Sequence, residues 1–266
     1  MYSSRLITFL FLLLPLQTIA EVYDVSTTAE LRAALASAAA NEENDTIRLA
    51  AGIYKTTEDG GGRFEYYSDK ADDLTIIGSS SSSEEVILSG DNTHQVLNHR
   101  TTESASLYLQ GLTVRDSYSP PTEYDTAAVN ADGYINIFDC LFADNKTAGG
   151  AVKTNANADI DQSIFTGNLR YGADIDSYGL TTTVSNSSFI ATNDNGNGVG
   201  FYTRGKLIVT NTVFRDNDIG LRHSGYGGSA GLSVAQSLFE SNKHRGLSFY
   251  SQSDLQITDS KFRLNG

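Results

Sequence analysis

The residues best suited to chemistry recur in short segments of the second half of the chain. They comprise two carboxylates, two cations and two phenols, namely Lys153, Asp174, Asp176, Tyr202, Arg222 and Tyr250. Carboxylates can hold Ca²⁺ against an acidic polysaccharide, and a lysine or arginine can remove a proton beside a uronate carboxylate. If strands place these side chains on one outer face, they would line a sugar-binding groove.

The same residues also admit a purely structural interpretation. Lys153 beside Asp176, and Asp174 near Arg222, would be ion pairs between neighbouring strands, and such pairs contribute little to stability at a surface. The catalytic residues are therefore unknown, and no metal ligands are assigned. We expect His223 to fill a position in the core.

Composition and charge exclude several classes of protein. The chain has 266 residues, with 19 Lys and Arg against 32 Asp and Glu, and its net charge is −13. Such a charge repels phosphate backbones, which argues against nucleic acid as a partner. Because Cys140 is the single cysteine, neither an intrachain disulfide nor a cysteine-cluster metal site can form. Many Tyr, Phe, Ser, Thr, Asn and Gly residues favour strands and turns.

Residues 1–20 have the features of a secretory signal peptide. Arg5 precedes the apolar run Leu6 to Leu14, Pro15 breaks that run, and small residues lead to Ala20. The run is too short to cross a bilayer, so no membrane span is expected after cleavage. The mature chain would carry a charge of −14, because the leader holds one arginine and no acid. We expect a secreted, extracellular or cell-surface location, with the periplasm as an alternative.

One helix and several short strands are expected in residues 21–100, which would form the N-terminal cap and the first irregular coils. Thr27 and Glu30 form a capping box before apolar residues at helical spacing, which predicts a helix from Thr28 to Ala39. Alternating or apolar runs between polar turns predict strands at residues 46–49, 53–54, 74–78 and 86–88.

An internal repeat dominates residues 101–266. Six phenylalanines lie 23, 24, 25, 25 and 23 residues apart, at Phe142, Phe165, Phe189, Phe214, Phe239 and Phe262. An apolar or small pair precedes each at minus seven and minus five, and a small residue stands at minus two. Asparagine stands at plus three, except that Thr192 replaces it once. Identical side chains at this period predict stacked coils of three short strands, in which each Asn bonds to the next.

The capping helix, the I-x-I-x-x-S-x-F-x-x-N pattern and the glycine after it resemble right-handed parallel β-helix proteins of the pectate-lyase-like superfamily. The segments Phe142-Ala143-Asp144-Asn145 and Gly149-Gly150-Ala151-Val152 also resemble the repeats of polymorphic outer-membrane proteins, although later repeats depart from them. The resemblance implies an all-β fold, a single-stranded right-handed parallel β-helix (solenoid) with an N-terminal capping helix. His244 resembles the histidine of polygalacturonase-like hydrolases, but that family's other motifs are missing.

Aligning the repeats on the glycine after each Asn places the candidate residues in two outward columns. One column holds Ala151, Asp174, Gly200, Arg222 and Ser248, and the other holds Lys153, Asp176, Tyr202, Ser224 and Tyr250. The chain ends directly after Phe262-Arg263-Leu264-Asn265, before the next expected strand, which predicts further repeats or domains C-terminal to it.

Two functions remain open from the sequence. The first is an exported β-helix that recognises a polysaccharide or cell-envelope glycan, or serves as an adhesive or structural element, with no identifiable catalytic set and no cofactor. The alternative is a polysaccharide lyase or related enzyme acting on acidic polysaccharides, which would use Ca²⁺. Fold alone decides neither. The net negative charge opposes capture of polyanions unless a cation intervenes.

Overall fold

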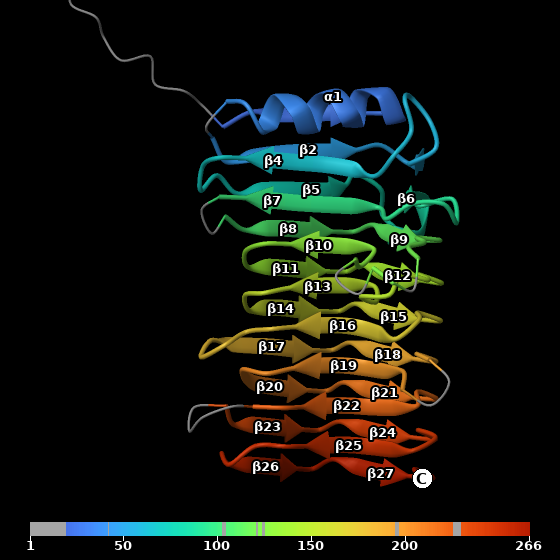
Figure 1. Ribbon diagram of the computed structural model, residues 1–266, viewed down its shortest axis with the longest axis vertical. Coiled ribbons are helices and arrows are strands. Elements are labelled where there is room, and N and C mark those ends of the chain that lie inside the picture. The colour runs from blue at the N-terminus through green and yellow to red at the C-terminus, as the bar shows by residue number, and fades with distance from the viewer. Residues whose placement is uncertain are drawn as a thin grey trace, which may run out of the picture.

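The computed structural model describes residues 20–41, 43–102, 105–120, 122–123, 126–194, 197–225 and 230–266. Figure 1 shows a stack of coils that begins under the helix α1 and ends at β27. Each regular coil adds one strand to each of three parallel sheets. The predicted all-β parallel solenoid is therefore confirmed. The predicted signal peptide lies, apart from Ala20, outside the described residues.

The ten-stranded sheet includes the first strand of each coil. Its members are β1 (Val22–Val25), β2 (Asp45–Leu49), β5 (Leu74–Gly78), β8 (Leu107–Gln110), β11 (Ile135–Phe138), β14 (Ala158–Asp161), β17 (Thr181–Ser185), β20 (Lys206–Thr210), β23 (Leu232–Ala235) and β26 (Leu255–Thr258). Most inward residues at alternate positions are apolar, because they face the interior of the solenoid; the buried Asp45 and Thr182 are exceptions.

The nine-stranded sheet carries the phenylalanine column. Its members are β3 (Gly52–Lys55), β6 (Val86–Ser89), β9 (Thr113–Arg115), β12 (Leu141–Ala143), β15 (Ile164–Thr166), β18 (Ser188–Ile190), β21 (Val213–Arg215), β24 (Leu238–Glu240) and β27 (Lys261–Arg263). The short 3-10 helix η1 (Ser83–Glu85) precedes β6.

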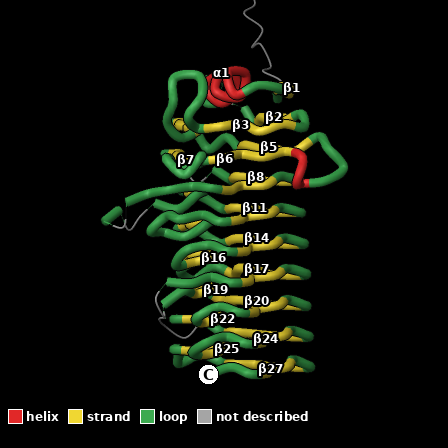
Figure 2. The backbone as a smooth tube through the Cα atoms, turned by 90° about the vertical axis from the view of Figure 1, so that its right-hand side faces the viewer, coloured by secondary structure: helices red, strands yellow, loops and turns green. Residues whose placement is uncertain are grey.

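The eight-stranded sheet carries the candidate site on its outer face. Its members are β4 (Phe64–Ser68), β7 (Leu97–Thr101), β10 (Val129–Ala131), β13 (Val152–Thr154), β16 (Tyr171–Ile175), β19 (Val199–Thr203), β22 (Ile219–His223) and β25 (Arg245–Phe249). Figure 2 shows that some of the connections between strands project well beyond the stack of coils.

Helix α1 (Thr28–Ala38) ends one residue before the predicted boundary and covers the first coil. The predicted capping box is present, because the Thr27 side chain accepts from the Glu30 amide and the Glu30 carboxylate accepts from the Thr27 amide. Leu31 and Leu35 are buried beneath it. Within the described residues, no helix is long and apolar enough to cross a membrane.

The four predicted strands of residues 46–88 fall within β2, β3, β5 and β6, but β1, β4 and β7 were missed. Strand β4 buries Phe64, Tyr66 and Ser68 and exposes the residues between them. That alternation is present in the sequence and could have identified the strand.

The predicted phenylalanine column is confirmed for five of its six members. Phe142, Phe165, Phe189, Phe214 and Phe239 are fully buried, with successive ring centroids 4.6 to 5.3 Å apart. Phe262 stacks on Phe239 at 4.5 Å but is 45% exposed, because no described coil follows it.

The predicted asparagine ladder is also present. Asn145 Nδ2 donates to Asn168 Oδ1 at 3.0 Å, and Asn242 Nδ2 donates to Asn265 Oδ1 at 2.8 Å. The small residues two positions before each Phe form a second ladder, which the sequence showed only as a column of small side chains. In it, for example, the Cys140 amide donates to Ser163 Oγ at 3.1 Å. Both ladders satisfy buried backbone groups at the turns.

Candidate functional site

The outer face of the eight-stranded sheet brings the candidate side chains into one column. Lys153 pairs with Asp174, Asp174 with Tyr202 and Tyr202 with Arg222 along successive strands. The predicted register, which set Lys153 beside Asp176, is therefore wrong by two residues from β13 to β22, whereas the predicted neighbours Arg222 and Ser248 do pair. All four side chains still face outward, since a slip of two keeps the face of a strand.

The physical reason for the wrong register is the variable length of the connections that lead into this sheet. Residues 144–151 and 191–198 form longer connections than residues 167–170 and 216–218. The glycine used for the alignment precedes the strand where the connection is long, at Gly149 and Gly198. It is the second residue of the strand in the other coils, at Gly172, Gly220 and Gly246, so the alignment slips by two residues between the two kinds of coil. Asp176 and Tyr250 follow β16 and β25 in the neighbouring outward column.

Two depressions adjoin at Lys153 along this face, and together we call them the sheet groove. One has a volume of about 460 Å³ and is lined by Lys153, Arg170, Tyr171, Asp174, Tyr202, Arg204, Arg222, Ser224 and Tyr250. The other has a volume of about 400 Å³ and is lined by Arg63, Asn98, Arg100, Asn130, Ala131, Asp132, Lys153, Thr154 and Asn155. Because Lys153 lines both, the groove follows the axis of the solenoid.

The lining of the sheet groove holds more cations than acids. It contains six cations, Arg63, Arg100, Lys153, Arg170, Arg204 and Arg222, against the two acids Asp132 and Asp174. Arg63 and Arg204 also form ion pairs with Glu65 and Asp176, two acids outside this lining. The whole chain, by contrast, carries a net charge of −13. Positive charge is therefore concentrated where the groove lies.

Arg204 is the central residue of the groove that sequence reasoning missed. Its Nη1 lies 2.7 Å from Asp176 Oδ2 and donates to the Tyr178 hydroxyl at 2.8 Å, while its Nε donates to the Tyr202 hydroxyl at 2.9 Å. The hydrogen bond to Tyr202 is the main cause that raises the pKa of Arg204. The sequence did contain a signal for Arg204. It stands two positions after the outward Tyr202, and alternate residues of a strand share a face.

Asp174 lies partly buried on the floor of the groove. Burial raises its pKa to about 6, and the neighbouring charge of Lys153 counteracts part of that rise. Burial also raises the pKa of Asp176, against the opposing effect of Arg204. Arg222 has a buried Nε with no partner among the described residues. The floor therefore holds a carboxyl that titrates near neutrality and a guanidinium with an unused donor.

Replacing Asp174 with asparagine is expected to stabilise the protein at pH 8 by about 1 kcal/mol, and by less at pH 4. A carboxyl whose folded pKa of about 6 exceeds its ordinary value of 3.8 destabilises the fold as pH rises through that window. Urea denaturation at both pH values measures the difference. Asp194→Asn serves as the control outside the groove. A stability gain that is equal at both pH values would contradict the assignment.

Two histidines lie inside the solenoid. His223 is buried, as predicted, with its ring 5.1 Å from that of Phe249 and Nε2 2.8 Å from the Gly205 carbonyl oxygen. His99, which the sequence analysis did not single out, is buried and stacks on Tyr66 at 5.0 Å. Burial lowers the pKa of His99 to about 4. Neither side chain lines the groove.

The predicted Ca²⁺ of the lyase alternative does not fit these carboxylates. Asp176 is paired with Arg204, and the charges of Lys153 and Arg204 both act on Asp174. A cation placed between the two carboxylates would meet both positive side chains at close range. Within the part of the chain that the structure describes, no group of three His, Cys, Asp or Glu residues is arranged to hold a metal ion.

Comparison with known proteins agrees with this architecture. The crystal structure of YbhC from Escherichia coli is similar to this chain with a TM-score of 0.55 and 11% identity, over 94% of this chain and 86% of that one. This likeness concerns the fold. No curated protein matches the sequence. A family model described as a right handed beta helix region matches residues 96–262. The coils that carry the sheet groove lie largely within that range, and the chain belongs to the right-handed β-helix family.

Proposed function

We propose that the sheet groove binds a single extended chain of an acidic polysaccharide. The observation that carries the proposal is that two adjoining depressions follow one another along the solenoid axis and are lined mainly by cations. Successive coils lie about 4.8 Å apart, so outward side chains from neighbouring strands repeat at a short interval along the axis. A linear polymer can meet several of these side chains in turn.

The charge of the groove lining affects binding of a polyanion more than the net charge of the whole chain does. At physiological salt the Debye length is about 8 Å, so a polymer in the groove responds mainly to the side chains that line it. Lys153 lies on β13, Arg204 follows β19 and Arg222 lies on β22, so these three cations fall within four successive coils on one face, with Asp174 on β16 between the first two. The sequence-based argument that a net negative charge opposes polyanions therefore does not apply at this surface. A nucleic-acid duplex is wider and would also meet the acidic remainder of the protein.

The tyrosines favour a saccharide over other narrow polyanions. Tyr178 and Tyr250 are 61% and 56% exposed, and Tyr202 lies between Asp174 and Arg222 on the floor of the groove. Sugar rings present apolar C–H faces that pack on aromatic rings, while their hydroxyls bond to the polar rim. The leader-like residues 1–20 support export, which would bring the protein to extracellular or cell-envelope glycans.

A second candidate function is cleavage of the bound polymer. Asp174 favours it, because a carboxyl with a pKa of about 6 on the floor of a groove is suited to proton transfer near neutral pH. Lys153 and Arg222 lie in the same column and would neutralise a uronate carboxylate. Elimination would form unsaturated uronates, which absorb ultraviolet light.

Replacing Lys153 or Arg222 with alanine is expected to weaken binding of polygalacturonate by about tenfold each, because a charge-assisted hydrogen bond contributes about 1.5 kcal/mol. Isothermal titration calorimetry of the mature chain measures the dissociation constant. Higher salt should weaken binding to the parent protein and affect the variants less. Lys206→Ala, which removes an exposed lysine outside the groove, should leave binding unchanged.

Equal binding by the parent chain and both groove variants would contradict the proposed site, and failure of the parent chain to bind polygalacturonate, alginate and chondroitin sulfate would contradict the function. Ultraviolet-absorbing products that disappear in Arg222→Ala would favour the cleavage candidate instead.

A further inference from the structure

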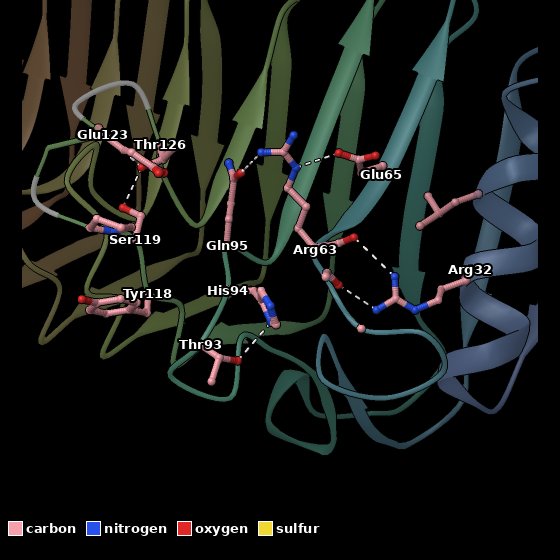
Figure 3. Close-up of a pocket in the computed structure, with 14 residues that line it drawn as sticks. Arg32, Arg63, Glu65, Thr93, His94, Gln95, Tyr118, Ser119, Glu123 and Thr126 are labelled. Carbon is pink, nitrogen blue, oxygen red and sulfur yellow. Dashed lines mark hydrogen bonds and ion pairs between the residues drawn. The ribbon is translucent and has the colours of Figure 1, made fainter.

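A further cavity, which we call the notch, lies between two connections near the N-terminal end of the solenoid (Figure 3). It has a volume of about 580 Å³. Arg32 from α1 and the loop at Gly61 and Gly62 line one end, and Tyr118 and Ser119 line the other. Residues 93–95, which lead into β7, also line it. No function described above uses this cavity.

The notch contains a buried amide with an unused donor. Gln95 is only 5% exposed, and its Oε1 accepts a hydrogen bond of 2.9 Å from Arg63 Nη1. Its Nε2 is buried and has no partner among the described residues. Arg63 is in turn held by Glu65, whose Oε1 lies 2.8 Å from Arg63 Nε. Because a buried donor without a partner is unfavourable, a ligand that accepts a hydrogen bond from Gln95 would remove that cost.

Both walls of the notch are held in place without a ligand. Arg32 Nη2 donates to the carbonyl oxygens of Thr56 at 3.0 Å and Gly62 at 2.7 Å, which ties the loop to α1. On the opposite wall, Thr126 Oγ1 donates to Ser119 Oγ at 2.6 Å, and the amide of Ala148 donates to the same oxygen at 3.0 Å. A preformed site of this kind loses little conformational entropy on binding.

The lining of the notch differs from that of the sheet groove in charge. Its two arginines, Arg32 and Arg63, are balanced by Glu65 and Glu123, and hydroxyls from threonine, serine and tyrosine complete the polar lining. Tyr118, which is 42% exposed, adds an aromatic ring. Balanced charges exclude strong selection for an anion. Mixed donors and acceptors beside a ring match a molecule with several neighbouring hydroxyls and an apolar face.

We infer that the notch binds one neutral sugar unit, a site separate from the acidic-chain site of the sheet groove. Gln95 Nε2 donates to a sugar hydroxyl, the carboxylate of Glu65 or Glu123 accepts from another, and the Tyr118 ring packs against the sugar. Arg63 lines both the notch and the groove, so the two sites adjoin at this residue. The inference does not require that the groove bind its polymer.

The test is a titration of the ¹⁵N-labelled mature chain with galactose, glucose, mannose, rhamnose and N-acetylglucosamine, each compared with galacturonate. We expect at least one neutral sugar to shift the Gln95 side-chain amide resonance. Gln95→Glu keeps an acceptor for Arg63 but removes the donor, and it should weaken binding of that sugar by about tenfold. Tyr118→Ala, which alters an exposed ring, should weaken binding several-fold. Gln110→Glu, an exposed glutamine on the ten-stranded sheet, is the matched control.

Denaturation midpoints of the variants separate loss of binding from loss of folding. If Gln95→Glu unfolds, sugar binding by Tyr118→Ala, which alters an exposed ring, still tests the site. A shift of the Gln95 amide by galacturonate alone would overturn the assignment to a neutral sugar. No shift with any sugar, or unchanged binding in both notch variants, would overturn the site. Loss of polygalacturonate binding in Lys153→Ala with retained sugar binding would show that the two sites are independent.

Discussion

Replacing Phe189 with alanine is expected to lower the free energy of unfolding by about 3 to 5 kcal/mol, the range observed for buried aromatic deletions. The ring is fully buried between those of Phe165 at 4.6 Å and Phe214 at 5.3 Å, and a third ring, Phe201, meets it edge-on at 5.5 Å. The stacked coils above and below are tied by their ladders and can collapse little into the cavity. The loss therefore includes both the transfer energy and the cavity energy.

Urea denaturation followed by circular dichroism measures this loss, with Phe262→Ala as the matched control. Phe262 is 45% exposed and stacks only on Phe239, so the same substitution should cost about 1 kcal/mol. Equal costs at the two positions would show that the column is not a continuous buried core.

Replacing Asn217 with alanine is expected to cost about 1 to 3 kcal/mol. Its Nδ2 donates to the Phe189 carbonyl oxygen at 2.9 Å and to Asn242 Oδ1 at 3.1 Å, and its Oδ1 accepts from the Thr192 amide at 2.9 Å. Asn217 is fully buried. In the alanine variant the backbone groups that it bonds to would therefore lose their partner, and water would not reach them to take its place. Thr192 replaces asparagine in the preceding coil, so the side-chain hydrogen bond between these two coils of the ladder comes from Asn217.

Asn193→Ala is the control for this variant, because Asn193 is exposed and its side-chain amide donates to the nearby Ala191 carbonyl oxygen, while the backbone bond to Asn168 is kept in the variant. Its cost should stay within about 0.5 kcal/mol. The same denaturation experiment ranks the variants, and a larger loss for Asn217→Ala than for Phe189→Ala would contradict the view that ring burial, more than the turn ladder, holds the coils together.

The features predicted best from the sequence are those that depend on local pattern or strict repetition. The capping box of Thr27 and Glu30 acts within one helical turn, so it needs no tertiary context to be recognised. The Phe and Asn columns were recognised because a parallel stack in register places equivalent residues of successive coils above one another. The period therefore predicted both the fold and its core.

By itself the sequence determined the solenoid, its capping helix, its phenylalanine core and the set of outward residues from which a binding face could be drawn. Only the tertiary structure decided that Lys153 lies beside Asp174, that Arg204 holds Asp176, and that Gln95 keeps an unused donor in a notch. The physical reason is that these contacts join different coils, whose register depends on connections of unequal length. The repeat pattern shows which residues face inward, because burial restricts the residue types at those positions. Residue types on the outer face and in the loops are not restricted in this way, so the sequence does not reveal which outer residues pair or where a loop cavity forms.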